Sequence, residues 1–170
     1  MIRIGQGIDV HPFDDSRPLI LGGVRISDHG GLAGHSDADA VLHAVTDALL
    51  GAAGAGDIGQ YFPSNDERWR NAESSRFLAE AKRIVTEMDG EVANIDITII
   101  AQKPKLAGYR DAIQAKIANL LDIPNGHVNV KATTTDHLGF IGREEGICAM
   151  AIVCIVIPSG SEGSGARETR

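Results

Sequence analysis

Two short polar patterns near the N-terminus constrain the fold more than any other part of the chain. The first is Asp9-Val10-His11 in "GIDVHPF", and the second is His43 in "HSDADAVLHAVTDALLG". Side chains alternate along a strand, so an Asp-x-His pair on extended backbone places both polar groups on one face. His43 lies in a segment whose apolar residues recur with helical spacing. If the three side chains meet, a strand and a helix must converge at one point.

Two imidazoles and one carboxylate suit Zn²⁺, and three protein ligands leave a fourth position for water or substrate. This donor set is typical of a catalytic metal centre. The alternative is an ordinary Asp-x-His pair together with a surface histidine. Asp39 and Asp47 lie one helical turn to either side of His43. They are either hydrogen-bond acceptors for a ligating histidine or members of a solvated helix face, and the sequence leaves both readings open.

The length of 170 residues favours one domain with a real hydrophobic core. We expect residues 1–157 to form a single catalytic domain and residues 158–170 to form a flexible Gly/Ser-rich tail. The net charge of −7, without a basic stripe, argues against nucleic-acid binding. No apolar run reaches the roughly 18 residues of a membrane span. Because the first residues also lack the apolar core of a signal peptide, we expect a cytoplasmic protein, bacterial or plastid-type after removal of a transit peptide.

The spacing of apolar residues predicts a mixed α/β (α+β) chain. The expected strands cover residues 1–10, 19–26, 95–99, 128–134 and 147–157. The first expected helix begins with Ser36 or Asp37 as its N-cap and ends near Gly51; two more cover residues 72–88 and 109–121. Residues 51–66 read as a long loop. We therefore expect a small mixed sheet of four to five strands with helices on one face.

The last expected strand is apolar at both parities, so it carries apolar side chains on the face away from the helices as well. A single copy of the chain would expose them as a large patch. We therefore expect a second subunit to cover this face.

Two further segments carry chemistry. Residues 101–107 place Lys103 and Lys105 at a strand end, where they either meet a phosphate or are simply solvated. Thr133–Thr135, followed by Asp136 and Arg143, offer hydroxyls, a carboxylate and a guanidinium that suit a phosphate with a hard cation. The alternative for the threonines is an exposed strand face.

Five segments stand in a fixed order across most of residues 2–147: "RIGQGIDVH", "PLILGGVRI", "HSDADAVLHAVTDALLGAAGAGDIG", "DITIIAQKPKL" and "VNVKATTTDHLGFIGREEGI". Together they resemble the 2-C-methyl-D-erythritol 2,4-cyclodiphosphate synthase family of the non-mevalonate isoprenoid pathway. The run over residues 35–59 is the most specific of the five.

The resemblance implies a phosphorus–oxygen lyase that acts on 4-diphosphocytidyl-2-C-methyl-D-erythritol 2-phosphate. The 2-phosphate attacks the β-phosphorus, CMP leaves, and a cyclic diphosphate forms. The resemblance also implies a homotrimer around an internal cavity, with active sites between subunits and an isoprenoid diphosphate as a possible cavity ligand. A zinc-dependent phosphohydrolase and a non-catalytic carrier of isoprenoid-type ligands are the competing functions.

The resemblance assigns Zn²⁺ to Asp9, His11 and His43, and a second divalent cation, Mg²⁺ or Mn²⁺, to the surroundings of Asp136. His35 and Thr134 are the implied catalytic residues. The implied substrate-binding residues are Asp9, Val10, His11, His35, Ser36, Asp57, Ile58, Gly59, Phe62, Pro63, Ser64, Asn65, Asp66, Ala101, Gln102, Lys103, Pro104, Lys105, Leu106, Ala107, Thr133, Thr134, Thr135, Asp136, Phe140 and Arg143.

Three positions depart from the family pattern. Asp136 stands where the family usually has Glu, Ser64 where it has Asp, and Glu144 where it has Gly. None of the three is an expected zinc ligand.

Overall fold

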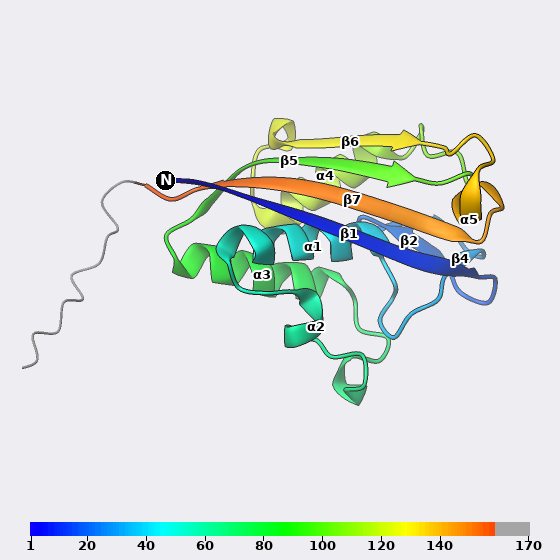
Figure 1. Ribbon diagram of the computed structural model, residues 1–170, viewed down its shortest axis with the longest axis horizontal. Coiled ribbons are helices and arrows are strands. Elements are labelled where there is room, and N and C mark those ends of the chain that lie inside the picture. Colours follow the sequence, from blue (N-terminus) through cyan, green and yellow to red (C-terminus); the bar gives the residue numbers. More distant parts are fainter. Residues whose placement is uncertain (159–170) are drawn as a thin grey trace, which may run out of the picture.

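A computed structural model describes residues 1–158, so the expected tail lies outside the described residues except for Pro158. The main sheet has five strands in the order β4-β1-β7-β5-β6 (Figure 1). Their bounds are β1 Ile2–Asp14, β4 Gly31–Leu32, β5 Glu91–Ile100, β6 Val128–Thr133 and β7 Gly146–Val156. β5 and β6 are parallel and the other neighbours are antiparallel, which confirms the mixed sheet.

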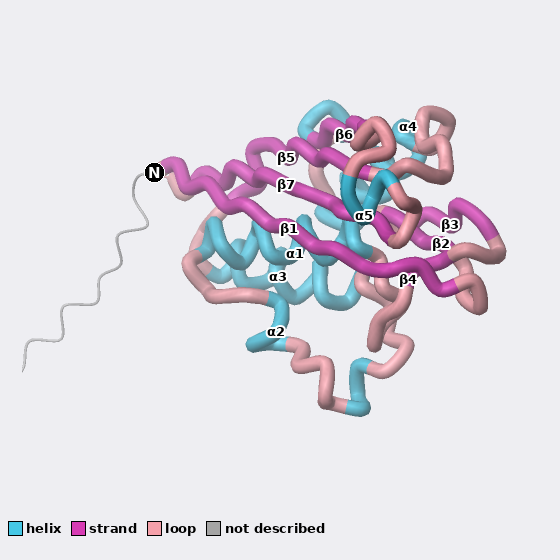
Figure 2. The backbone as a smooth tube through the Cα atoms, turned by 45° about the vertical axis from the view of Figure 1, so that its right-hand side comes forward, coloured by secondary structure: helices cyan, strands magenta, loops and turns pink. Residues whose placement is uncertain are grey.

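Three longer helices cover one face of this sheet, as the sequence predicts (Figures 1 and 2). They are α1 Ala40–Ala53, α3 Ser75–Glu87 and α4 Arg110–Leu121. Four short helical turns lie in the connections: α2 Ile58–Tyr61, η1 Glu67–Trp69, η2 Asn125–His127 and α5 Gly139–Gly142. None of the helices in residues 1–158 is long and apolar enough to cross a membrane.

Helix α1 packs unusually close to strand β1, and two glycines permit this. A Cβ atom on Gly5 would lie 1.9 Å from the carbonyl oxygen of Ala48, and one on Gly7 would lie 2.0 Å from that of Ala44. Because side chains alternate, Gly5 and Gly7 share the helix-facing side of β1 with Asp9 and His11. The close approach therefore brings the first turns of α1 within reach of both polar side chains.

Three sequence-based expectations about the elements are wrong. Residues 19–26 form a separate two-stranded hairpin, β2 Leu19–Leu21 and β3 Val24–Ser27, because Gly22 and Gly23 turn the chain with φ of 61° and 74°. The first strand extends past residue 10 to Asp14, with Pro12 at the last rung of its pairing with β7. The expected long loop contains α2, whose N-cap is Asp57.

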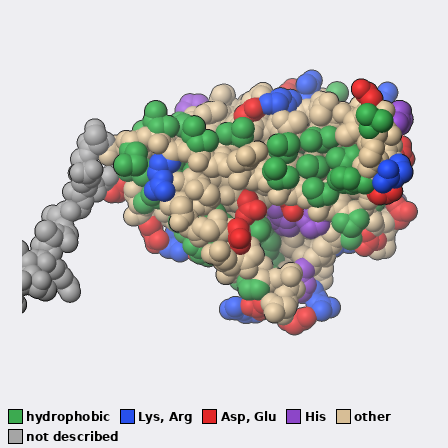
Figure 3. Space-filling model, viewed as in Figure 1, with side chains coloured by type: hydrophobic (Ala, Val, Ile, Leu, Met, Phe, Trp, Pro, Cys, Tyr) green, Lys and Arg blue, Asp and Glu red, His purple; other side chains and the backbone are tan. Residues whose placement is uncertain are grey.

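The sheet face away from the helices is largely apolar along β1 and β7, and it is uncovered in the single chain. Ile4, Ile8, Val10 and Ile152 are 68%, 53%, 45% and 48% exposed. Figure 3 shows hydrophobic side chains gathered over this face. The expectation of apolar residues on both faces of β7 is confirmed.

Candidate active site

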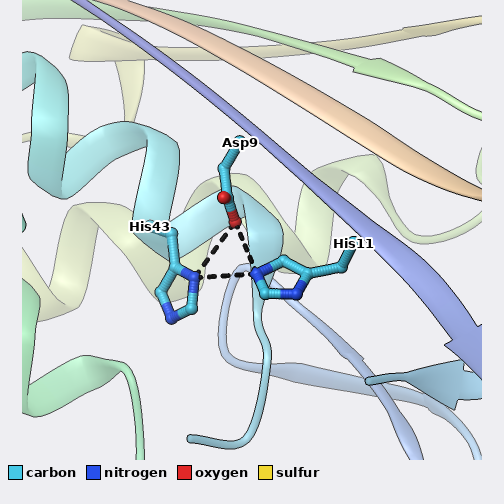
Figure 4. A group of neighbouring side chains, drawn as sticks. All are labelled: Asp9, His11 and His43. Atoms are coloured by element: carbon cyan, nitrogen blue, oxygen red, sulfur yellow. Dashed lines mark hydrogen bonds and ion pairs between the residues drawn. The ribbon is translucent and has the colours of Figure 1, made fainter. Parts of the chain in front are cut away.

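Asp9, His11 and His43 converge beneath the sheet, where β1 meets the first turn of α1 (Figure 4). Asp9 Oδ2 lies 2.9 Å from His11 Nε2 and 3.0 Å from His43 Nδ1, and the two ring nitrogens are 3.2 Å apart. Tetrahedral coordination at zinc bond lengths separates neighbouring ligand atoms by roughly 3.3 Å. The three donors are thus spaced as ligands of one divalent cation.

Hydrogen bonds on the far side of the His11 ring favour the same conclusion. His11 Nδ1 lies 2.6 Å from the carbonyl oxygen of Ala33, which can only accept, so Nδ1 carries the proton. In the neutral ring Nε2 then presents its lone pair to Asp9 and His43. Such a cluster of lone pairs and a carboxylate is stable only around a cation or a proton.

The charge of Asp9 controls the electrostatics of the cluster. Burial opposes ionisation, but hydrogen bonds with His11 and His43 lower the pKa of Asp9 below its ordinary value. For His11, burial acts to lower the pKa, yet the hydrogen bond with Asp9 raises it above its ordinary value. Without a metal, His11 therefore keeps its added proton to a higher pH than a free imidazole does, and a divalent cation at Nε2 competes with that proton.

Asp39 has a different role from either reading of the sequence. It is fully buried and is the N-cap of α1, so the expectation of Ser36 or Asp37 as the cap is wrong. Its carboxylate accepts from the backbone N–H groups of Gly22 and Gly23 at 2.8 and 2.6 Å, and of Val41 and Leu42 at 3.1 and 3.0 Å. This carboxylate therefore fastens the β2–β3 turn to the start of α1 and does not accept a hydrogen bond from the His43 ring.

Asp47 lies one turn beyond His43 and is half-buried, so it is not part of a solvated face either. Its carboxylate accepts the backbone N–H of Ile58 at 2.7 Å. This bond fixes the start of α2, which carries Ile58 and Gly59, against the helix that carries His43.

The three candidate metal ligands open into a pocket of about 230 Å³. Its lining residues are Asp9, His11, His35, Ser36, His43, Ile58, Gly59, Phe62, Ser64, Trp69 and Phe77. Eight residues of the expected substrate site are therefore together with His43. Asp57, Pro63, Asn65 and Asp66 belong to the adjoining loop and do not line the pocket.

Trp69 and Phe77 were missed from the sequence as pocket residues. Phe77 stacks on Phe62 with ring centroids 4.4 Å apart, and Trp69 stands edge-on to Phe62 at 4.9 Å. In the sequence, Phe77 has the spacing of a helical core residue, so its contribution to the pocket wall could not be recognised there. His35 Nε2 donates to the carbonyl oxygen of Asp66 at 2.9 Å and so ties the loop to the pocket.

A second pocket of about 380 Å³ lies at the ends of β5 and β6. Because these strands are parallel and Ile100 pairs with Thr133, the residues that follow both strands meet at one sheet edge. The lining residues are Ala101, Gln102, Pro104, Lys105, Leu106, Ala107, Arg110, Ala132, Thr133 and Thr134. Arg110 and Ala132 are additions that the sequence did not indicate.

Other expected site residues lie outside both pockets. Lys103 forms an ion pair with Glu144 at 2.9 Å, so the added charge of Glu144 is compensated. Arg143 pairs with Glu145 at 2.7 Å. Val10 points to the opposite face of the sheet from Asp9 and His11.

Around the threonines, Thr134 Oγ1 lies 3.3 Å from Asp136 Oδ1, and Thr135 Oγ1 donates to the carbonyl oxygen of Leu138 at 2.7 Å. Phe140 is exposed. These residues form an open rim on the surface of the single chain.

The two pockets share no residue. The candidate metal ligands come from β1 and α1, whereas the second pocket lies at the ends of β5 and β6, with β7 between them. Two to three strand spacings correspond to roughly 9 to 14 Å. One chain thus carries two separate pockets.

The fold and the site define a mixed α+β protein with a candidate divalent-metal centre and a separate pocket at the end of a parallel strand pair. The chain belongs to the YgbB family, whose sequence model matches residues 2–156. A relative from Geobacillus sp. (strain WCH70), named 2-C-methyl-D-erythritol 2,4-cyclodiphosphate synthase, is 56% identical over 155 residues, 91% of this chain and 98% of its own length. A relative of the same name from Haemophilus influenzae (strain PittEE) is 53% identical over 156 residues, 92% of this chain and 99% of its own length.

Solved structures of similar proteins indicate the same family. The bifunctional IspDF from Campylobacter jejuni matches with a TM-score of 0.89 and 48% identity; the match covers 91% of this chain but only 42% of that chain. The CDP complex of IspF from Plasmodium falciparum matches with a TM-score of 0.81 and 35% identity, over 93% of this chain and 97% of that chain. The family resemblance is confirmed.

Proposed function

We propose that this chain catalyses the reaction for which its relatives are named. It would convert 4-diphosphocytidyl-2-C-methyl-D-erythritol 2-phosphate to the 2,4-cyclodiphosphate and release CMP, as a phosphorus–oxygen lyase. The observation that carries the proposal is the convergence of Asp9, His11 and His43 at metal-ligand spacing on the rim of a pocket. The CDP complex of a structural relative supports a cytidine-linked substrate.

The chemistry needs alignment more than activation. The nucleophile is a phosphate of the substrate itself, so no side chain has to form a covalent intermediate. A new P–O bond forms between the 2-phosphate and the β-phosphorus, and the bond from the β-phosphorus to the bridging oxygen of CMP breaks. No water is consumed. The protein has to hold both phosphates in line and to neutralise the charge that accumulates between them.

The residues of the chain supply this in distinct ways. Asp9, His11 and His43 would hold Zn²⁺, which when bound neutralises and polarises a phosphate oxygen. His35 and Thr134 would position the phosphorus that is attacked, and Lys105 and Arg143 would neutralise phosphate charge. The hydrogen bond of His35 to Asp66 supports this role because it holds the ring at the pocket wall.

A second cation, Mg²⁺ or Mn²⁺, would be held near Asp136 and would neutralise the charge of the diphosphate. The Thr134 hydroxyl next to that carboxylate offers a further oxygen ligand. Because the side chain at this position is shorter than the Glu of the family, the ion would be held either through this shorter reach or through a water.

We infer that the complete site forms between subunits of a homotrimer. A cytidine held in the pocket at residues 101–107 would be separated from the metal ligands of the same chain by roughly 9 to 14 Å of sheet, which favours a site completed by a neighbouring subunit. The uncovered apolar face supplies the surface for assembly. The same assembly would enclose the expected internal cavity, where an isoprenoid diphosphate could bind.

Incubation with the diphosphocytidyl substrate, Zn²⁺ and Mg²⁺ tests the proposal. The expected products are CMP and a cyclic diphosphate without ¹⁸O when the reaction is run in labelled water. The His43→Ala variant should be inactive. Release of CDP or free phosphate, or a ring-opened product containing ¹⁸O, would show the phosphohydrolase reaction.

A further inference from the structure

The candidate metal ligand His43 is held from behind by two side chains, Ser36 and Ser74, and none of the assigned roles includes Ser74. Its Nε2 atom, on the side away from Asp9, lies 2.9 Å from Ser74 Oγ and 3.2 Å from Ser36 Oγ. Ser74 is fully buried at the start of α3. Its hydroxyl also contacts Asp37 Oδ1 at hydrogen-bonding distance.

The direction of these hydrogen bonds follows from their chemistry. An ionised carboxylate can only accept, so the single hydroxyl proton of Ser74 is donated to Asp37. Ser74 Oγ is then left to accept from His43 Nε2–H. With Nε2 protonated, the lone pair of the neutral ring is at Nδ1, which faces Asp9 and His11.

The position of Ser74 argues against a purely structural use of its hydroxyl. Serine at a helix N-cap usually bonds a free N–H of the first turn. Ser74 occupies that position in α3 but makes no such bond. Its backbone N–H donates to Asp37 Oδ2 at 3.1 Å, which fixes the side chain of Asp37 from a second direction.

We propose that Ser74 and Asp37 are positioning residues, which set the tautomer and orientation of His43 for metal binding. Carboxylates that orient ligating histidines are common; here a hydroxyl relays the carboxylate to the ring. The relay stands at the end of the loop that lines the pocket, where Asn71 N–H bonds the His35 carbonyl at 2.8 Å. The arrangement thus couples the placement of this loop to the metal centre. The inference rests on the proposed metal centre and not on the reaction.

Metal titration of the full-length protein, freed of metal with a chelator, tests the proposal. Co²⁺ absorption reports coordination, and competition with a chromophoric chelator gives the Zn²⁺ dissociation constant. Ser74→Ala should weaken binding about 10- to 100-fold and change the Co²⁺ spectrum. The matched control is Ser75→Ala, one residue on, whose hydroxyl donates to the exposed carboxylate of Glu73; this variant should bind metal as the wild type does.

Asp37→Asn provides a second variant that keeps the shape of the site but removes the charge. It should weaken binding less than Ser74→Ala, because an amide oxygen can still accept from the hydroxyl. If Ser74→Ala does not fold, as judged by circular dichroism of the metal-free protein, Asp37→Asn decides.

Equal metal affinity of the folded Ser74→Ala and Ser75→Ala variants would overturn the inference. If Ser74→Ala does not fold, an unchanged metal affinity of Asp37→Asn would also overturn the inference. A wild-type protein that binds neither metal would overturn the metal centre as well, whereas wild-type binding with loss in the Ser74 variant supports the inference whatever the reaction proves to be.

Discussion

At the scale of single residues, a few buried polar groups determine the geometry of the site. Asp39 is the clearest example, because one carboxylate satisfies N–H groups from the β2–β3 turn and from the start of α1. Removing it would leave several buried donors without a partner, which costs more than the loss of an ordinary helix cap.

Asp39→Ala should therefore lower the free energy of unfolding by roughly 2 to 4 kcal/mol. Urea denaturation of the metal-free protein measures this. Asp15→Ala, an exposed carboxylate at the neighbouring β1–β2 connection, is the control and should change stability by less than about 0.5 kcal/mol. A loss in the Asp39 variant no larger than in the control would contradict the role given to this cap.

The pKa of His11 gives a second prediction at this scale. Since Asp9 raises this pKa above its ordinary value, the ring in the metal-free protein is protonated below that pKa, and Zn²⁺ must then displace a proton. The apparent Zn²⁺ affinity should fall by about tenfold per pH unit as the pH decreases below the raised pKa. Titrations between pH 5 and pH 8 measure this, and a pH-independent affinity would argue against a shared proton at the ligands.

At the scale of elements, the contact between β1 and α1 brings the ligands together. Much of this contact could be predicted from the sequence. The period of two in Asp-x-His and the helical spacing around His43 indicated three candidate ligands, which the structure brings together, and the elements that carry them. The sequence could not show how close the elements lie, because the space left by Gly5 and Gly7 depends on which helix packs there.

Tertiary contacts explain why the sequence did not indicate the roles of several other residues. Asp39 reads as a polar residue beside His43, yet the hairpin of residues 19–27 folds over it and buries it. Ser74, Trp69 and Phe77 join the site only because the loop before α3 returns to α1, and no local pattern marks that return. Residues 101–107 and the threonines were recognised separately, and the parallel pairing of β5 and β6 joins them in one pocket.

Gly7→Ala tests the β1–α1 contact. The added methyl group would lie 2.0 Å from the carbonyl oxygen of Ala44, so α1 must move away from β1 and carry His43 with it. We expect a loss of roughly 3 kcal/mol in stability and weaker metal binding. Gly126→Ala, where a Cβ atom meets nothing within 4 Å, is the control. Full metal affinity in a folded Gly7→Ala protein would show that the close packing is not required.

At the scale of the whole molecule, the proposed assembly would account for both the two separate pockets and the apolar sheet face. Each chain offers a metal pocket at β1 and a separate pocket at the ends of β5 and β6. In that assembly, a neighbouring subunit would cover the exposed isoleucines, and residues of one subunit would complete the pocket of the next. We therefore expect a single chain to bind the metal, and only the oligomer to turn over the substrate.

Ile8→Lys tests this separation. Ile8 is 53% exposed on the apolar face, and a charge buried there without a partner would oppose association. We expect monomers by sedimentation velocity, Zn²⁺ binding within about threefold of the wild type, and CMP release reduced at least about 100-fold. Thr86→Lys, on the exposed side of α3, should leave assembly and activity unchanged. A monomeric Ile8 variant that keeps full activity would show that one chain contains the whole site.

The metal centre is the central claim, and anomalous scattering from crystals grown with Zn²⁺ tests it most directly. Data collected on both sides of the zinc absorption edge should give one strong peak per chain, about 2.0 to 2.2 Å from His11 Nε2, His43 Nδ1 and a carboxylate oxygen of Asp9. Absence of a peak at these atoms, or a zinc ion bound only to other residues, would contradict the account.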